Sequence, residues 1–167
     1  MSPQPEQPKP VRVLFVCLGN ICRSPTAHGV FQALLERERI AHRISVDSCG
    51  TAAWHTGKAP DPRSTAAART RGYDLSVLRA RQLQWHDFFE FDYMLAMDSQ
   101  NLEEIRRQAP LDYAGHIGLL LDFADAGSGR DVPDPYHGGG AGFEHVLDLV
   151  EAACEGLLRE IRRRDAG

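Results

Sequence analysis

The amino-acid sequence predicts an α/β fold: a single domain in which a four-stranded parallel sheet is flanked by helices on both faces. Short apolar runs rich in β-branched residues alternate along the chain with longer segments whose apolar residues recur at helical spacing. The first two strands are separated by a helix, an order typical of a right-handed parallel unit. The 167 residues suit one domain with a sizeable core.

The first strand is predicted over Val11–Val16, an apolar run that Cys17 ends. Ser24 and Pro25 then have the residue types of a helix start, with serine at the N-cap and proline at the first helical position. The helix is expected over residues 26–39. Residues 1–10 contain four prolines and few apolar side chains, so we expect a disordered Pro-rich leader before a domain that covers residues 11–167.

The remaining elements are assigned from apolar pattern and from turn residues. A glycine-rich stretch over 123–142 is expected to be a loop, because it holds six glycines and two prolines. The expected elements are a strand over 43–46, a helix over 62–72, a helical turn over 86–90, a strand over 91–97, a helix over 100–108, a strand over 116–121 and a helix over 143–164. Ligands of such sheets bind beyond the carboxyl ends of the strands.

The turn between the first strand and the first helix has the chemistry of an anion site. Gly19 and Asn20 tolerate positive φ, so the chain can turn tightly there. Backbone N–H groups of such a loop, next to a helix N-terminus, bind anions, and Arg23 adds a bidentate cationic fork. Positive charge and N–H donors favour the thiolate form of Cys17 at the base of the loop. The loop is therefore predicted to bind a phosphoryl group and to present a nucleophile to its phosphorus.

Simpler explanations exist for each part of this loop. A lone cysteine at a strand end is often a small buried apolar residue, and an isolated arginine is usually a surface charge. A glycine-containing turn between strand and helix also occurs in nucleotide-binding proteins, but the sequence lacks both their Gly-x-Gly pattern and a Gly-Lys-Ser/Thr ending. The combination within nine residues favours the phosphoryl site.

Composition restricts the possible partners and location. The net charge of −4 does not favour binding to nucleic acid or to an anionic membrane, and no apolar run approaches the length of a membrane span. The chain begins without a signal-peptide pattern, and its four cysteines show no regular spacing. We therefore expect reduced thiols and a cytoplasmic protein. The histidines show no metal-ligand spacing, so no metal or other cofactor is expected.

The string CLGNICRSP, residues 17–25, resembles the phosphate loop of the low-molecular-weight protein tyrosine phosphatases. The resemblance continues to the C-terminus, through Asp47-Ser48, Trp54, Arg81-Gln82, Phe91-Asp92-Tyr93, Met97-Asp98 and Asp134-Pro135-Tyr136. It implies a Rossmann-like phosphatase fold and a phosphoric monoester hydrolase that acts on phosphotyrosine through a cysteinyl-phosphate intermediate. It also implies a protein substrate that carries phosphotyrosine, and a cognate tyrosine kinase is a possible partner.

A proton donor for the leaving oxygen is expected on the glycine-rich loop. Asp134 precedes Pro135, which favours an extended backbone, and long loops of this kind often carry function. The residues alone do not exclude Asp122, Asp125 or Asp131 on the same stretch. The resemblance selects Asp134, because the general acid of the family precedes Pro-Tyr.

The other site residues are expected to hold the phosphate, to brace its loop or to wall the cavity. Trp54 and Tyr136 are expected to wall the site and to suit a phenyl phosphate. Asn20 is expected at positive φ with Ser48 as its partner, and the hydroxyl of Ser24 is expected either to cap the helix or to stabilise the thiolate. The backbone N–H groups expected on the phosphate oxygens belong to Leu18, Gly19, Asn20, Ile21, Cys22, Arg23 and Ser24.

Two positions depart from the family pattern. Leu78 stands where relatives usually carry a histidine, which removes one expected brace of Asn20. His137 stands where relatives often carry a second tyrosine, so substrate preference is expected to differ. Cys22 lies near enough to Cys17 in sequence for a protective disulfide to be a hypothesis.

Two alternative functions fit parts of the sequence. An arsenate reductase of the same fold would need further cysteines on a mobile segment, and only Cys49 and Cys154 remain outside the loop. A non-catalytic phosphate-binding module would lack the nucleophile or the acid, and both are present.

Overall fold

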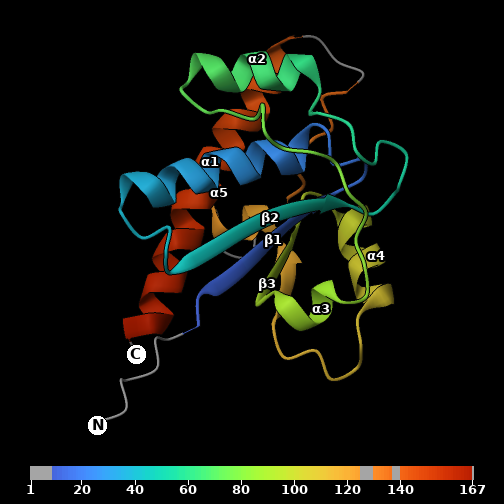
Figure 1. Cartoon of the computed structure of the whole chain (residues 1–167), viewed down its shortest axis with the longest axis vertical. Helices are drawn as coiled ribbons and strands as arrows, with labels where there is room; N and C mark the ends of the chain where they lie inside the picture. Colours follow the sequence, from blue (N-terminus) through green and yellow to red (C-terminus); the bar gives the residue numbers. More distant parts are fainter. Residues whose placement is uncertain (1–8, 125–129, 137–139, 167) are drawn as a thin grey trace, which may run out of the picture.

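The computed structural model describes residues 9–124, 130–136 and 140–166, so most of the expected Pro-rich leader lies outside the described residues. Its centre is a four-stranded sheet with the order β2-β1-β3-β4, in which every neighbouring pair is parallel (Figure 1). The strands are β1 (Val11–Cys17), β2 (Ile44–Gly50), β3 (Tyr93–Ala96) and β4 (His116–Leu119). The predicted parallel sheet is confirmed.

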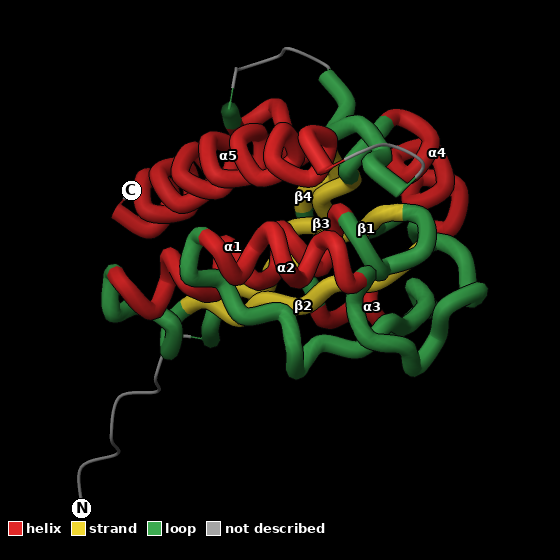
Figure 2. Tube along the Cα trace, turned by 90° about the horizontal axis from the view of Figure 1, so that it is seen from above, coloured by secondary structure: helices red, strands yellow, loops and turns green. Residues whose placement is uncertain are grey.

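Helices cover both faces of this sheet (Figure 2). On one face, α1 (Arg23–Arg37) and α5 (Gly140–Ala166) pack on the sheet, with α2 (Pro62–Thr70) against both of them. On the other face lie α3 (Asp87–Glu90) and α4 (Ser99–Gln108). Alternate residues of β1 enter the two cores, Phe15 the first and Leu14 the second, which explains why the sequence of β1 is continuously apolar.

Several element ends differ from the sequence-based expectation. Helix α1 begins at Arg23, and its N-cap, Cys22, makes no side-chain capping bond, so the assignment of Ser24 as the N-cap is wrong. Strand β2 continues to Gly50, because it pairs with β1 as far as Cys17. The fourth strand ends at Leu119 and is followed by a 3-10 turn, η1 (Leu120–Phe123).

Both core clusters are formed by large apolar side chains that are almost wholly buried. Within the described residues, no helix has the length and apolar character needed to cross a membrane. The carboxyl ends of β1 and β3 lead into the segments that form the site described next.

Candidate active site

The phosphate loop, residues 17–24, turns sharply at the end of β1. Asn20 has a φ of 56°, in the left-handed region expected for it. The loop passes directly over the end of β2, where a Cβ on Gly50 would lie 2.6 Å from the carbonyl oxygen of Leu18. Thr51 N–H donates to the carbonyl oxygen of Cys17 at 2.9 Å, so the loop is fixed to the chain that leaves β2.

The sulfur of Cys17 is surrounded by hydrogen-bonding groups. The backbone N–H of Asn20 donates to Sγ at 3.3 Å, and the hydroxyl of Ser24 lies 2.9 Å from it. Asn20 Nδ2 donates to Ser24 Oγ at 2.7 Å, which leaves the hydroxyl hydrogen of Ser24 to donate elsewhere. The carbonyl of Cys49, 3.3 Å away, competes with the sulfur for that hydrogen. Of the two jobs expected for Ser24, the structure favours the contact with the sulfur.

The brace of Asn20 differs from the one predicted. Its Oδ1 accepts from the backbone N–H of Arg81 at 3.0 Å, whereas Ser48 Oγ lies 3.1 Å from His28 Nδ1. Ser48 pairs in register with Phe15, so both side chains face α1 rather than the loop. The expectation that Ser48 is the partner of Asn20 is therefore wrong. Leu78 packs on the larger core.

Arg23 is buried and held by protein acceptors before any substrate binds. Its Nη1 donates to Asp98 Oδ2 at 2.7 Å and to the carbonyl oxygen of Val132 at 3.0 Å. Burial opposes its charge, but Cys17 and Asp98 outweigh that effect and raise the pKa of Arg23 above its usual value. The guanidinium therefore stays charged and fixed in orientation, as an anion clamp requires.

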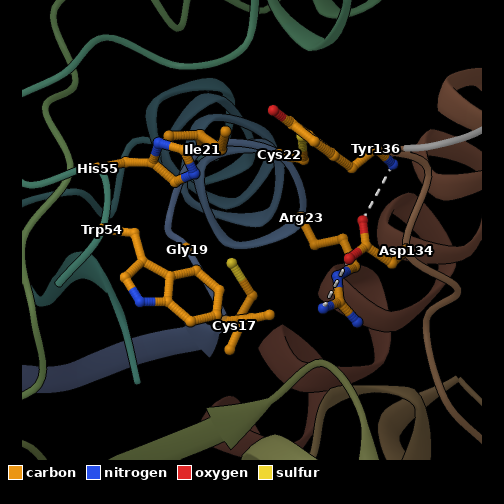
Figure 3. Close-up of a pocket in the computed structure, with 10 residues that line it drawn as sticks. Cys17, Gly19, Ile21, Cys22, Arg23, Trp54, His55, Asp134 and Tyr136 are labelled. Atoms are coloured by element: carbon orange, nitrogen blue, oxygen red, sulfur yellow. Dashed lines mark hydrogen bonds and ion pairs between the residues drawn. The ribbon is translucent and has the colours of Figure 1, made fainter. Parts of the chain in front are cut away.

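The loop forms the base of a cavity of about 310 Å³. Figure 3 shows Trp54 and His55 on one side of Cys17, and Asp134 and Tyr136 on the other. Trp54 is 70% exposed and Tyr136 is 40% exposed, which is typical of side chains at a rim. The lining residues are Cys17, Leu18, Gly19, Ile21, Cys22, Arg23, Trp54, His55, Asp134 and Tyr136.

His55 was not expected in the site. Its imidazole lies over the phosphate loop, where a Cβ on Gly19 would come within 2.9 Å of His55 Cδ2. Its ring centroid is 6.5 Å from that of Tyr136. The only sequence signal is its position next to Trp54 in the same loop.

The acid segment, residues 130–136, brings Asp134 to the cavity. Asp134 Oδ2 lies 3.8 Å from Arg23 Nη2, and Oδ1 accepts from the backbone N–H of Tyr136 at 3.0 Å. Asp131 is engaged elsewhere, because its Oδ1 accepts from Ser99 N and Oγ at 3.0 and 2.8 Å. Of the other two candidates, Asp122 is in η1 and does not line the cavity, and Asp125 lies outside the described residues, as does His137.

The thiols other than Cys17 are unsuited to nucleophilic attack. Burial raises the pKa of Cys22 to about 12, and burial also raises the pKa of Cys49 and of Cys154. All four cysteines are free. Cys17 differs from the other three in having both the Asn20 N–H and the Ser24 hydroxyl beside its sulfur at the base of the cavity.

One cluster of potential metal ligands occurs in the part of the chain that the structure describes: His86, Asp87 and Glu90. None of the three lines the cavity. Both oxygens of Asp87 accept from the guanidinium of Arg81, so this carboxylate already has a cationic partner.

Comparison with known proteins agrees with this geometry. The sequence model of the family described as "Low molecular weight phosphotyrosine protein phosphatase" matches residues 12–166. A relative of that name from Schizosaccharomyces pombe is 46% identical over 86% of this chain and 92% of its own, and a low molecular weight protein-tyrosine-phosphatase from Streptomyces coelicolor is 45% identical over 93% and 96%.

Solved structures agree in fold. The crystal structure of YfkJ from Bacillus subtilis superposes with a TM-score of 0.88 at 37% identity, over 95% of this chain and 99% of that one. The crystal structure of a protein tyrosine phosphatase from Entamoeba histolytica superposes with a TM-score of 0.87 at 36% identity, over 93% of this chain and 99% of that one. The chain therefore belongs to the low molecular weight phosphotyrosine protein phosphatase family, with the α/β fold that its sequence predicts.

Proposed function

We propose that this phosphatase hydrolyses phosphotyrosine in proteins through a phosphate ester carried on Cys17. The observation that carries the proposal is that a hydrogen-bonded thiol, a buried guanidinium and a carboxyl group line one cavity of about 310 Å³. The three groups supply the nucleophile, the clamp for the phosphoryl oxygens and the proton donor that phosphoryl transfer needs.

In the first step, the Cys17 thiolate attacks phosphorus as the bond to the tyrosine oxygen breaks. Asp134 donates its proton to that oxygen, so the leaving group departs as neutral phenol. Arg23 and the N–H groups of the phosphate loop bind the equatorial oxygens, which carry charge in the transition state. The product of this step is a cysteinyl phosphate and an ionised Asp134.

In the second step, water attacks the same phosphorus. Asp134, now a carboxylate, takes a proton from the water, and the bond from sulfur to phosphorus breaks. Inorganic phosphate leaves, and Cys17 returns to the thiolate with Asp134 protonated. The hydroxyl of Ser24, 2.9 Å from the sulfur, supports the returning negative charge.

The side chains at the rim of the cavity are suited to an aromatic substrate. Trp54 and Tyr136 offer apolar ring surface on opposite sides of Cys17 (Figure 3). A phenyl ring bound between them would bury apolar area and make ring–ring contacts. A serine phosphate has no ring to place there, so we expect preference for phosphotyrosine.

The location and partners proposed for the protein follow from this chemistry. A thiolate nucleophile requires a reducing compartment, which supports a cytoplasmic enzyme. A tyrosine kinase must supply the phosphorylated substrate, so a cognate kinase is a proposed partner. An arsenate reductase is not favoured, because Cys49 and Cys154 are wholly buried and neither lines the cavity.

The test is a steady-state assay with one phosphotyrosine peptide and the same peptide with phosphoserine. We expect release of phosphate from the first at a kcat/KM at least about 100-fold above the second. A phosphoarginine peptide is tested as a third substrate, because a structural neighbour at 30% identity is a Drosophila arginine phosphatase. Arsenate with thioredoxin and its reductase tests the reductase. Faster turnover of phosphoserine, phosphoarginine or arsenate than of phosphotyrosine would contradict the proposal.

A further inference from the structure

A single arginine side chain joins helix α2 to the acid segment across the rim of the cavity. Arg63, in the first turn of α2, donates from Nη2 to the carbonyl oxygen of Tyr136 at 2.9 Å. Its guanidinium carbon also lies 5.5 Å from the centre of the Tyr136 ring and 4.8 Å from the centre of the Phe143 ring in α5. The side chain therefore holds both the backbone and the ring of Tyr136.

The guanidinium is itself fixed by a neighbouring carboxylate. Asp61, the N-cap of α2, accepts from Arg63 Nε at 3.1 Å and from Nη2 at 3.0 Å. Asp61 is only 8% exposed, and its backbone N–H donates to the carbonyl oxygen of Ile21 at 2.8 Å. Arg63 is thus connected through Asp61 to the phosphate loop.

The same chain of contacts ends at the general acid. The backbone N–H of Tyr136 donates to Asp134 Oδ1 at 3.0 Å, so the residue that Arg63 holds is also the residue that orients the Asp134 carboxyl group (Figure 3). Asp134 meets the phosphate loop through a 3.8 Å approach of its Oδ2 to Arg23 Nη2, which is too long for a hydrogen bond. Its side chain is 45% exposed, so packing does little to fix it.

We propose that Arg63 is a positioning residue for proton transfer: it sets the Asp134 carboxyl group over the phosphate loop by fixing Tyr136. This inference rests on the proposed role of Asp134 as general acid. Arg63 does not line the cavity, so it acts through Tyr136 and not on the substrate. A displacement of about 1 Å at a reacting group costs on the order of 100-fold in rate, which gives such a contact a large effect on catalysis.

The contacts of Arg63 are not those of a residue that serves only to stabilise the fold. The Arg63 side chain is 46% exposed, and exposed ion pairs contribute little to folding. Lysine cannot replace arginine here, because a point charge cannot bind Asp61 with two nitrogens, donate to Tyr136 and stack on two rings together. The geometry therefore predicts a loss of activity in Arg63→Lys with little loss of stability.

The test compares Arg63→Ala and Arg63→Lys with Arg69→Ala, a matched exposed arginine on α2 that does not line the cavity. Values of kcat/KM, which report the first step and not the hydrolysis of the cysteinyl phosphate, are measured on aryl phosphates whose leaving phenols range from strongly to weakly acidic. We expect both Arg63 variants to lose about 10- to 100-fold with the weakly acidic phenols and less than about threefold with the most acidic one. Arg69→Ala should match the wild type throughout.

A double-mutant comparison separates positioning from a structural role. In an Asp134→Ala background, Arg63→Ala should lower kcat/KM by less than about twofold, because there is no acid left to position. Equal losses across all leaving groups, or an undiminished loss in that background, would overturn the inference about Arg63 alone. If Asp134→Ala itself showed no dependence on the leaving group, the acid assignment would fail and the inference with it. Arg63→Met replaces the alanine variant if that variant does not fold.

Discussion

The phosphate loop and the acid segment face each other across one cavity, yet the chain holds them in different ways. In the loop, Cys17, Asn20 and Ser24 are buried and hydrogen-bonded to one another, and neighbouring segments anchor the loop from outside, among them the chain that leaves β2. The acid segment is attached by long-range contacts. Val132 N–H donates to the carbonyl oxygen of Met97 at 2.7 Å, and Asp131 accepts from Ser99.

This difference matches the tasks of the two regions. The loop must hold a nucleophile and a cation in one geometry throughout the reaction, and buried hydrogen-bonded groups provide that rigidity. The acid segment must present one carboxyl group that exchanges protons with the leaving group and with water, which requires access to solvent. Damage to the loop should therefore abolish chemistry, whereas damage to the segment should weaken one proton transfer.

The largest effect is expected from Cys17→Ser. A serine hydroxyl in this loop is a far poorer nucleophile, so kcat on para-nitrophenyl phosphate should fall by more than about 10³-fold. Phosphate binding, measured by calorimetry, should remain, because the donors are the loop N–H groups and Arg23. Cys154→Ala, which removes a buried thiol outside the cavity, is the control. A serine variant that keeps a tenth of the wild-type kcat would remove Cys17 from its proposed role.

A smaller and more selective effect is expected on the other side of the cavity. Asp134→Ala should lower kcat on phenyl phosphate by about 10²- to 10⁴-fold, the usual contribution of general acid–base catalysis. The loss in kcat/KM, which reports the first step alone, should shrink for strongly acidic phenols, which leave without a proton. A loss of the same size for every phenol would mean that Asp134 is structural, and Asp131 would then be the next carboxyl group to test.

The phosphate loop also contains the residues for a reversible response to peroxide. Cys17 oxidised to sulfenic acid can condense with the Cys22 thiol, which lines the same cavity, to form a disulfide and water. Because burial raises the pKa of Cys22 to about 12, this step should be slow at neutral pH and faster in alkali. After peroxide and then dithiothreitol, wild type should recover a larger fraction of its starting activity than Cys22→Ser. Equal recovery of activity in the two proteins would mean that Cys22 does not protect Cys17 from irreversible oxidation.

The contrast between the two regions also explains how much the sequence could predict. The nucleophile, the cation and the positive φ of Asn20 lie within seven residues, so local chemistry identifies them. The contact of Arg81 with Asn20 spans 61 residues and that of Arg63 with Tyr136 spans 73, so both depend on how the chain folds in space. No local pattern marks either arginine for these contacts.

Ser48 shows why strand register limits such predictions. Side chains alternate between the faces of a strand, so the face of a residue is known only when its register is known. The sequence places the end of the second strand at residue 46, but β2 continues to Gly50 and pairs Ser48 with Phe15. That register directs Ser48 toward His28 in α1 and away from Asn20.

The smallest effect is expected from His28 in α1, which lies 3.1 Å from the hydroxyl of Ser48 in β2 and makes the stability of the fold sensitive to acid. Burial lowers the pKa of His28 below its usual value, and the charge of Asp47 offsets part of that shift. The folded protein therefore holds His28 neutral at a pH where the unfolded chain has already bound a proton. Its contribution to stability is full above the unfolded pKa of about 6.5 and is lost as the pH falls below that value.

The measurement is the free energy of unfolding in urea between pH 7.5 and pH 5. One such proton changes that free energy by at most about 1.4 kcal/mol per pH unit. As the pH falls, the free energy of unfolding should decrease less steeply in His28→Gln than in the wild type. His42 is exposed, so His42→Gln is a matched control that should keep the pH dependence of the wild type. Part of the pH dependence of the free energy of unfolding should remain in His28→Gln, because burial also lowers the pKa of His116. An unchanged pH dependence in His28→Gln would mean that the acid sensitivity of the fold arises elsewhere, and that the contact between α1 and β2 owes no part of its stability to a neutral His28.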